Sequence, residues 1–276
     1  MPHRSFTATA TATAAALAAL ATLAFASAAS AAPVTVQVTF TNLAPTNSVS
    51  YAPLRLGFNN GSFDAFNTGQ TATAPIISVA EGGSGSAWLP AFAAADPTAT
   101  LGSIGGALLP GQSHSATFTI DTTLNQFFTF AAMVIPSNDY FIGNDSPTEY
   151  HLFDASGQLL IQSIDGLASD IWDAGSEAFD PANAAFLVGG VNSQRTPQNG
   201  VVNSDFAELA GFNGLTTAAG YVFNSQLRAD SGVYRISFAT VPEPGSYGLV
   251  AAGLLAAGWV SRRRRGAASA GDDASA

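Results

Sequence analysis

Hydrophobic and polar residues alternate along several short stretches, and this alternation predicts β-strands. Val34–Thr41 reads VTVQVTFT, with Val or Phe at every second position, which is the period of a strand with one buried face. The same period occurs less regularly in Tyr51–Phe58 and clearly in His114–Ile120 and Val233–Thr240. We expect each stretch to place its apolar side chains on one face of a sheet.

The most apolar run between the two ends of the chain is Phe127–Ile135, in which Thr129 is the only polar residue. Such a run predicts a strand buried on both faces. Pro136 lacks a backbone donor and should end the strand. Ser137-Asn138-Asp139 follows directly, so a rigid strand is expected to deliver oxygen-bearing side chains to one edge of the fold.

The rest of the domain shows sequence patterns of short strands, helices and turns. A short strand is expected at Ile76–Ala80, a short helix at Ala87–Ala95, and a helical turn at Ser204–Ala210 with Ser204 as its cap. Asp154-Ala155-Ser156-Gly157 predicts a hairpin turn, and Asp165–Asp180 a carboxylate-rich loop. About eight strands with long loops predict an all-β fold, a β-sandwich.

Both ends of the chain resemble targeting segments. Residues 1–31 combine a weakly basic start, an Ala/Leu/Thr run and Ala-x-Ala spacing, the layout of a signal peptide. Near the other end, the apolar run Gly245–Val260 precedes Arg262, Arg263, Arg264 and Arg265. As a helix this run is marginally long enough to cross a membrane, with the arginines cytoplasmic. We therefore expect a signal peptide at 1–31, a domain at 32–241, a sorting segment with a transmembrane-type helix at 242–265 and a polar tail at 266–276.

The C-terminal segment resembles a PEP-CTERM sorting signal. Pro242-Glu243-Pro244, the apolar run and the arginine block follow one another in that order. The resemblance implies processing by an exosortase-type membrane enzyme in a Gram-negative bacterium that makes exopolysaccharide. A plain membrane anchor is the alternative.

The charge balance narrows the range of partners. All nine basic residues are arginines, and residues 34–241 carry four of them against sixteen acidic residues, a net charge of −12. This charge argues against direct binding to nucleic acid or to an anionic membrane surface. The chain has no cysteine, so disulfides, thiolate nucleophiles and cysteine metal ligands are excluded.

Three carboxylates are candidates for a metal site. Asp173 and Glu177 are separated by Ala-Gly-Ser, and Gly175 allows a sharp turn that aims both at one point. Asp139 can supply a third oxygen ligand from the neighbouring loop. Hard oxygen ligands suit Ca²⁺, whereas zinc would favour His or Cys, which are absent nearby. Solvated acidic loops are the alternative explanation.

Two motifs resemble the spondin N-terminal domain. They are Met133–Phe141 (MVIPSNDYF) and Trp172–Glu177 (WDAGSE), with weaker support from Gly61–Asp64, Leu109–Gly111 and Val233–Phe238. The resemblance implies an antiparallel β-sandwich with one bound Ca²⁺, held by Asp139, Asp173 and Glu177. The third ligand is Asp in the family, so Glu177 is a departure. Trp172 and Tyr140, which flank these ligands, are expected to pack the loops against the core.

These features predict a non-enzymatic calcium-binding adhesion or matrix module, exported to the cell surface or to the exopolysaccharide. Its extracellular ligand is unknown; exopolysaccharide and a surface protein are the candidates. His114 and His151 have no Ser or Asp partner at motif spacing, so catalysis has little support. A polysaccharide-acting enzyme and a ligand-free structural surface protein are the alternatives.

Overall fold

A computed structural model of the chain describes residues 33–242 and Leu255. The expected signal peptide and most of the C-terminal apolar run lie outside these residues. Within them, no helix is long and apolar enough to cross a membrane.

Two antiparallel sheets form the frame of the domain. One has four strands in the order β5-β1-β12-β9; the other has eight, in the order β11-β10-β7-β6-β3-β4, with β2 and β8 also paired to β6. Within the described residues, the expected β-sandwich therefore contains twelve strands rather than about eight. Their bounds are β1 (Val34–Asn42), β2 (Ser50–Tyr51), β3 (Leu54–Asn59), β4 (Thr100–Ile104), β5 (Ser113–Ile120), β6 (Phe127–Ile135), β7 (Tyr140–Gly143), β8 (Tyr150–His151), β9 (Ser163–Leu167), β10 (Trp172–Asp173), β11 (Asn203–Ser204) and β12 (Gly232–Thr240).

The main core lies between the two sheets. Inward side chains of β1, such as Val36, Val38 and Phe40, are fully buried and face rings from the larger sheet. The ring of Phe128 on β6 packs edge-on against that of Phe238 on β12, with centroids 4.9 Å apart. Such pairs join the sheets across the interior.

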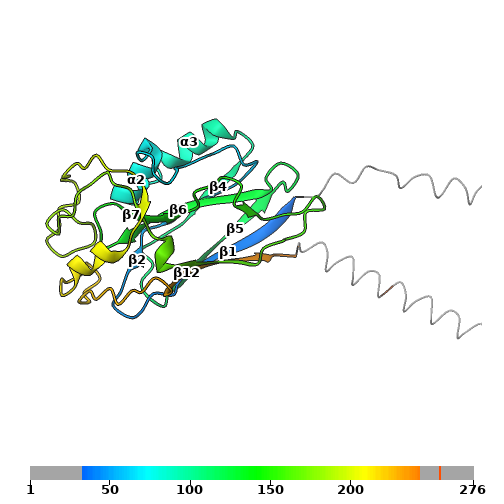
Figure 1. Cartoon of the computed structure of the whole chain (residues 1–276). Coiled ribbons are helices and arrows are strands. Elements are labelled where there is room, and N and C mark those ends of the chain that lie inside the picture. Colours follow the sequence, from blue (N-terminus) through cyan, green and yellow to red (C-terminus); the bar gives the residue numbers. More distant parts are fainter. Residues whose placement is uncertain (1–32, 243–254, 256–276) are drawn as a thin grey trace, which may run out of the picture. The chain divides into compact units, whose positions relative to one another are not determined.

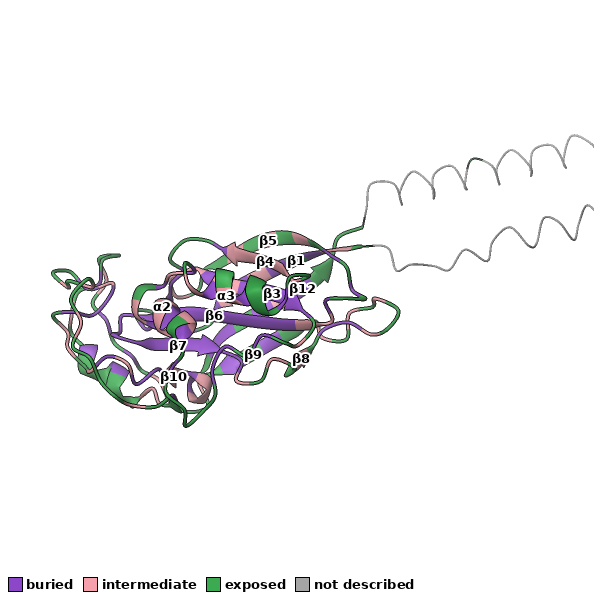
Figure 2. Ribbon diagram, turned by 90° about the horizontal axis from the view of Figure 1, so that it is seen from above, coloured by how far each residue is buried: buried purple, intermediate pink, exposed green. Residues whose placement is uncertain are grey.

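Helices α2 (Ala74–Gly82) and α3 (Trp88–Ala95) cover the outer face of the eight-stranded sheet. In Figure 1 they lie on the opposite side of β6 from β1 and β12. A second apolar cluster, containing Ile76, Val79 and Phe92, fills the space between these helices and the sheet. This third layer explains why β6 is buried along both faces (Figure 2), as its sequence predicts.

The prediction of a strand at Ile76–Ala80 was wrong, because α2 occupies these residues. Its start is set by Thr73, whose hydroxyl accepts a hydrogen bond from the Ile76 amide at 3.4 Å, as an N-cap does. Gly83 ends the helix in the left-handed conformation, with φ of 58°. These caps outweigh the strand preference of Ile and Val.

Two further expectations need correction. Ser204 does not cap a helix: it belongs to β11, and the following 3₁₀ helix η2 (Ala207–Phe212) has no side-chain cap. The expected loop Asp165–Asp180 contains the end of β9, the 3₁₀ turn η1 (Ala168–Asp170) and β10. Both β10 and β11 are two-residue strands added at the edge of the larger sheet, too short to give a periodic signal.

Candidate metal and ligand site

The candidate site lies where β6 ends and β7 begins. The Ile135–Pro136 peptide bond is cis, and the chain turns through Ser137-Asn138-Asp139 before entering β7. The Ser137 hydroxyl donates to the Val134 carbonyl and accepts from the Tyr140 amide, at 2.5 and 3.2 Å. This local bonding fixes the direction in which the turn presents Asp139.

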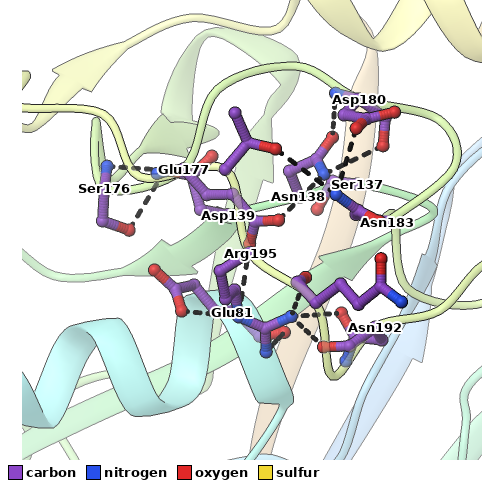
Figure 3. Close-up of polar contacts among 12 residues, drawn as sticks. Glu81, Ser137, Asn138, Asp139, Ser176, Glu177, Asp180, Asn183, Asn192 and Arg195 are labelled. Atoms are coloured by element: carbon purple, nitrogen blue, oxygen red, sulfur yellow. Dashed lines mark hydrogen bonds and ion pairs between the residues drawn. The ribbon is translucent and has the colours of Figure 1, made fainter.

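Asp139 is 1% exposed and holds the loop that follows β10. Its Oδ2 accepts hydrogen bonds from the Ser176 amide (2.7 Å), the Ser176 hydroxyl (3.2 Å) and the Glu177 amide (2.8 Å). Its carbonyl accepts from the Ala174 amide at 3.2 Å. Figure 3 shows the Asp139 carboxylate facing this loop. The Asp139 carboxylate thus fixes the backbone of residues 176–177, and its carbonyl fixes that of Ala174.

Asp139 and Asp173 are close enough to repel each other. Burial, and then the charge of Asp173, raises the pKa of Asp139 to about 7, although hydrogen bonds from Glu177 and Ser176 oppose the rise. Burial also raises the pKa of Asp173, against hydrogen bonds from Gly175 and Asn203. The structure therefore brings together two of the three carboxylates selected from the sequence.

The Glu177 carboxylate belongs to a different network. Its Oε1 accepts from the Asn138 side chain at 3.3 Å, and its Oε2 lies 3.4 Å from Nε of Arg195. The same Nε of Arg195 lies 2.8 Å from Oε2 of Glu81. Burial raises the pKa of Glu177, while Asn138 and Arg195 act in the opposite direction. Figure 3 shows Arg195 between the two glutamates.

Asp205 and Glu208 are two acidic residues that the sequence did not single out and whose charges interact with Asp173. The Tyr140 hydroxyl donates to Glu208 Oε2 at 3.3 Å. Burial is the main cause of the raised pKa of Glu208, and the charges of Asp173 and Asp205 raise it further. The pairing of Asp173 with Asn203 across β10 and β11 brings this segment alongside. Neither residue has a motif that links it to Asp173, so the sequence held no signal for them.

As they stand, the described side chains do not form a complete metal cage: no group of three or more His, Asp or Glu residues in the described part of the chain could hold an ion. Asp139 and Asp173 are nevertheless suitable in chemistry, because both offer carboxylate oxygens, Asp139 is buried and the charge of Asp173 raises its pKa. A third protein ligand would need a side-chain rearrangement. Glu177 would have to leave Arg195. The charge of Asp205 already raises the pKa of Asp173, and the charge of Asp173 raises that of Glu208.

The aromatic residues around the site have packing roles. The Trp172 indole donates to the Gly143 carbonyl at 3.1 Å and packs against Phe66 with ring centroids 5.4 Å apart. Tyr140 is 1% exposed within the main core. His151 stacks on Phe127 at 4.9 Å, on a strand away from the carboxylates.

Comparison with protein families identifies the C-terminal segment. Residues 240–265 match the PEP-CTERM protein-sorting motif. The chain carries an exosortase sorting signal. The match includes Pro242, Glu243, Pro244 and the four consecutive arginines, of which only Pro242 lies within the described residues. The motif implies export to the cell envelope or surface and processing by an exosortase-type enzyme. No curated protein matches the chain.

Proposed function

We propose that the described domain is a non-enzymatic calcium-binding module, displayed at the cell surface or in the exopolysaccharide after sorting. The observation that carries this proposal is the pairing of the buried Asp139 with the partly buried Asp173, whose charge raises the pKa of Asp139. A divalent cation between them would remove this repulsion. Ca²⁺ suits the pair because it accepts carboxylate, carbonyl and water ligands in flexible geometry.

The other members of the ligand set remain predictions. The resemblance to the spondin N-terminal domain implies Glu177 as the third ligand. Asp205, whose charge raises the pKa of Asp173, and Glu208, whose pKa is raised by the charge of Asp173, are the alternatives. In either arrangement the ion would stabilise the loop that Asp139 already holds through Ser176 and Glu177. An adhesive role follows from a rigid loop edge on a surface-sorted protein.

A polysaccharide-cleaving role for the same pair has less support. A catalytic carboxylate must reach its substrate, but Asp139 is 1% exposed and its Oδ2 already accepts three hydrogen bonds. We therefore include the absence of catalysis in the proposal.

The test is a calcium titration of the purified protein by thermal unfolding, after removal of metal with EDTA. An ion that binds only the folded state stabilises it by about 2.7 kcal/mol at a concentration 100 times its dissociation constant, so the melting temperature should rise by several degrees. Asp173→Asn should abolish the rise, and Asp230→Asn, at an exposed position in a turn, should retain it. A parent protein that shows no rise in millimolar Ca²⁺ is a ligand-free module, and the proposal fails. Parallel titrations of Glu177→Gln and Glu208→Gln would identify the third ligand.

A further inference from the structure

A cleft of about 270 Å³ lies beside the loop that Asp139 holds. One wall is α2 and the chain that leads into it; the other is formed by residues 174–176 and 198–200. Asp139 and Asp173 are not part of the lining. The cleft is therefore a neighbour of the proposed calcium site and has its own set of functional groups.

The wall opposite α2 is rigid. The Gln198 amide donates to the Ser176 carbonyl at 2.9 Å, and the Gly200 amide donates to the Gly175 carbonyl at 2.8 Å. Gly175 adopts a φ of 63°, and a Cβ there would lie 2.7 Å from the backbone nitrogen of Val201. Only glycine fits this close approach, so the two segments hold a fixed shape behind the cleft.

Polar groups at the rim are available for a ligand. The side chains of Thr71, Gln198 and Asn199 line the cleft and are exposed, and none of them forms a hydrogen bond with another described residue. Together they present one hydroxyl and two amides, which both donate and accept. Ala72, Ile77 and Ala174 supply an apolar floor.

Glu81 is the charged residue of the described lining, and its place in the helix does not favour a negative charge. It lies in the last turn of α2, where the helix dipole favours a cation. Arg195 compensates for it: Nε contacts Glu81 Oε2 at 2.8 Å, and Nη2 donates to the Glu81 carbonyl at 3.2 Å. This fixes the carboxylate and leaves Oε1 without a partner among the described residues.

The ligand chemistry follows from these groups. Arg195 is already shared between Glu81 and Glu177, and the lining residues that the structure describes include no other cation for an anionic ligand. A fixed carboxylate oxygen with two amides and a hydroxyl suits neighbouring hydroxyl groups, and the small apolar floor suits the C–H face of a ring. The volume lies below the usual range for drug-sized ligands, which limits the occupant to one such ring.

We propose that this cleft binds one neutral sugar residue, and that Glu81, Gln198 and Asn199 hydrogen-bond its hydroxyl groups. The inference deepens the proposed function, on which it rests only for the location of the protein at a polysaccharide-containing surface. It makes a neutral polysaccharide the extracellular partner.

The experiment is a titration of the purified protein with D-glucose, D-galactose, D-mannose, N-acetyl-D-glucosamine and D-glucuronate, followed by saturation-transfer difference NMR and calorimetry. We expect at least one neutral sugar to bind with a dissociation constant on the order of 1 mM, and D-glucuronate to bind at least tenfold more weakly. The proposal is overturned if no neutral sugar binds at about ten times that concentration, or if D-glucuronate binds best.

Two variants locate the binding. Asn199→Ala removes an exposed amide and should weaken binding several-fold with an unchanged melting temperature. Glu81→Gln should weaken binding tenfold or more, whereas Glu149→Gln, which removes an exposed carboxylate elsewhere, should have no effect. Equal binding by Asn199→Ala, Glu81→Gln and the parent would overturn the proposal. Sugar binding that persists in EDTA would separate the cleft from the calcium site, so each proposal can fail without the other.

Discussion

The four-stranded sheet and the loops around Asp139 hold their shapes by different means. In the sheet, β1 alternates fully buried apolar side chains with outward Thr residues. Outward hydroxyls pair across β1 and β5, as in the 2.8 Å contact between Thr39 and Ser115, and the pattern repeats along the strands. Around Asp139, each loop segment depends on one particular polar side chain. Asn138, for example, donates to the Asp180 carbonyl and accepts from the Asp180 amide, both at 3.1 Å.

This difference predicts which positions tolerate substitution and which lose stability. A periodic sheet distributes its stability over many similar contacts, so its polar face should accept substitutions while its apolar face should not. The loop end concentrates its stability in a few buried charged groups, which lose much when one partner is removed. Three measurements test this difference.

The largest effect is expected in the apolar core of the sheet. Phe40 is 1% exposed, and its ring lies 5.2 Å from that of Tyr51 and 6.5 Å from that of Tyr234. Phe40→Ala should lower the free energy of unfolding by about 3–5 kcal/mol, because the cavity and the lost burial add together. Urea denaturation measures this change, with Thr39→Ala as the surface control on the same strand. A loss below about 1 kcal/mol would show that the core can close around the cavity.

The second measurement compares two arginine ion pairs. Arg195 faces Glu177, whose side chain is fully buried, whereas Arg235 and Asp165 are both about half exposed. Arg195→Gln leaves a buried carboxylate uncompensated and should cost about 3 kcal/mol; Arg235→Gln should cost less than about 1 kcal/mol. The double variant Arg195→Gln, Glu177→Gln should regain much of the loss. Equal costs for the two arginines would remove the distinction between the regions.

The third measurement is the pH dependence of stability in EDTA. The pKa of Asp139 is raised from 3.8 to about 7 in the folded protein, so the folded state binds a proton more tightly than the unfolded chain. This contribution is greatest below pH 4 and is lost as the pH rises from about 4 to about 7. Asp121 and Asp154 have lowered pKa values and act in the opposite direction at more acidic pH. The raised pKa values of Asp173, Glu177 and Glu208 act in the same direction as that of Asp139. Asp139→Asn should therefore reduce the decline between pH 4 and 7, and Asp230→Asn should not; a parent protein with no decline would contradict the buried charge at Asp139.

The sequence predicted the regular part of the fold well for a physical reason. Four predicted strands agree with β1, β5, β6 and β12 to within a residue at each end, because each has a regular apolar face. The predicted strand Tyr51–Phe58 is divided between β2 and β3. The helix α2 was not predicted because its β-branched residues are typical of strands. Its helical state depends on capping by Thr73 and Gly83, which lie outside the predicted stretch. The strand β4 has only one buried residue among five and left no periodic signal.

The candidate site was predictable only in part. Asp139 and Asp173 each lie within a short motif, and the structure brings them together. Their role as metal ligands stays a prediction. The orientation of the Glu177 side chain toward Arg195 depends on a distant loop that carries no motif. Asp205 and Glu208 reach the site through the pairing of β10 with β11. Each of these strands has two residues, which is too short for a recognisable sequence pattern. Polar sites depend on such individual contacts, which leave no period in the sequence.

The sorting signal begins at the end of β12, and this strand has β1 on one side and β9 on the other. The register with β1 runs from Val36 opposite Thr240 to Asn42 opposite Tyr234. In Figure 1 this end of β12 lies at the opposite end of the domain from the loops that follow β10. A pull between an attached C-terminal tail and a ligand held at those loops would act along the strand axis. The hydrogen bonds on both sides of β12 would then share the load in shear, and the domain would resist mechanical force along the direction in which a surface tether applies it.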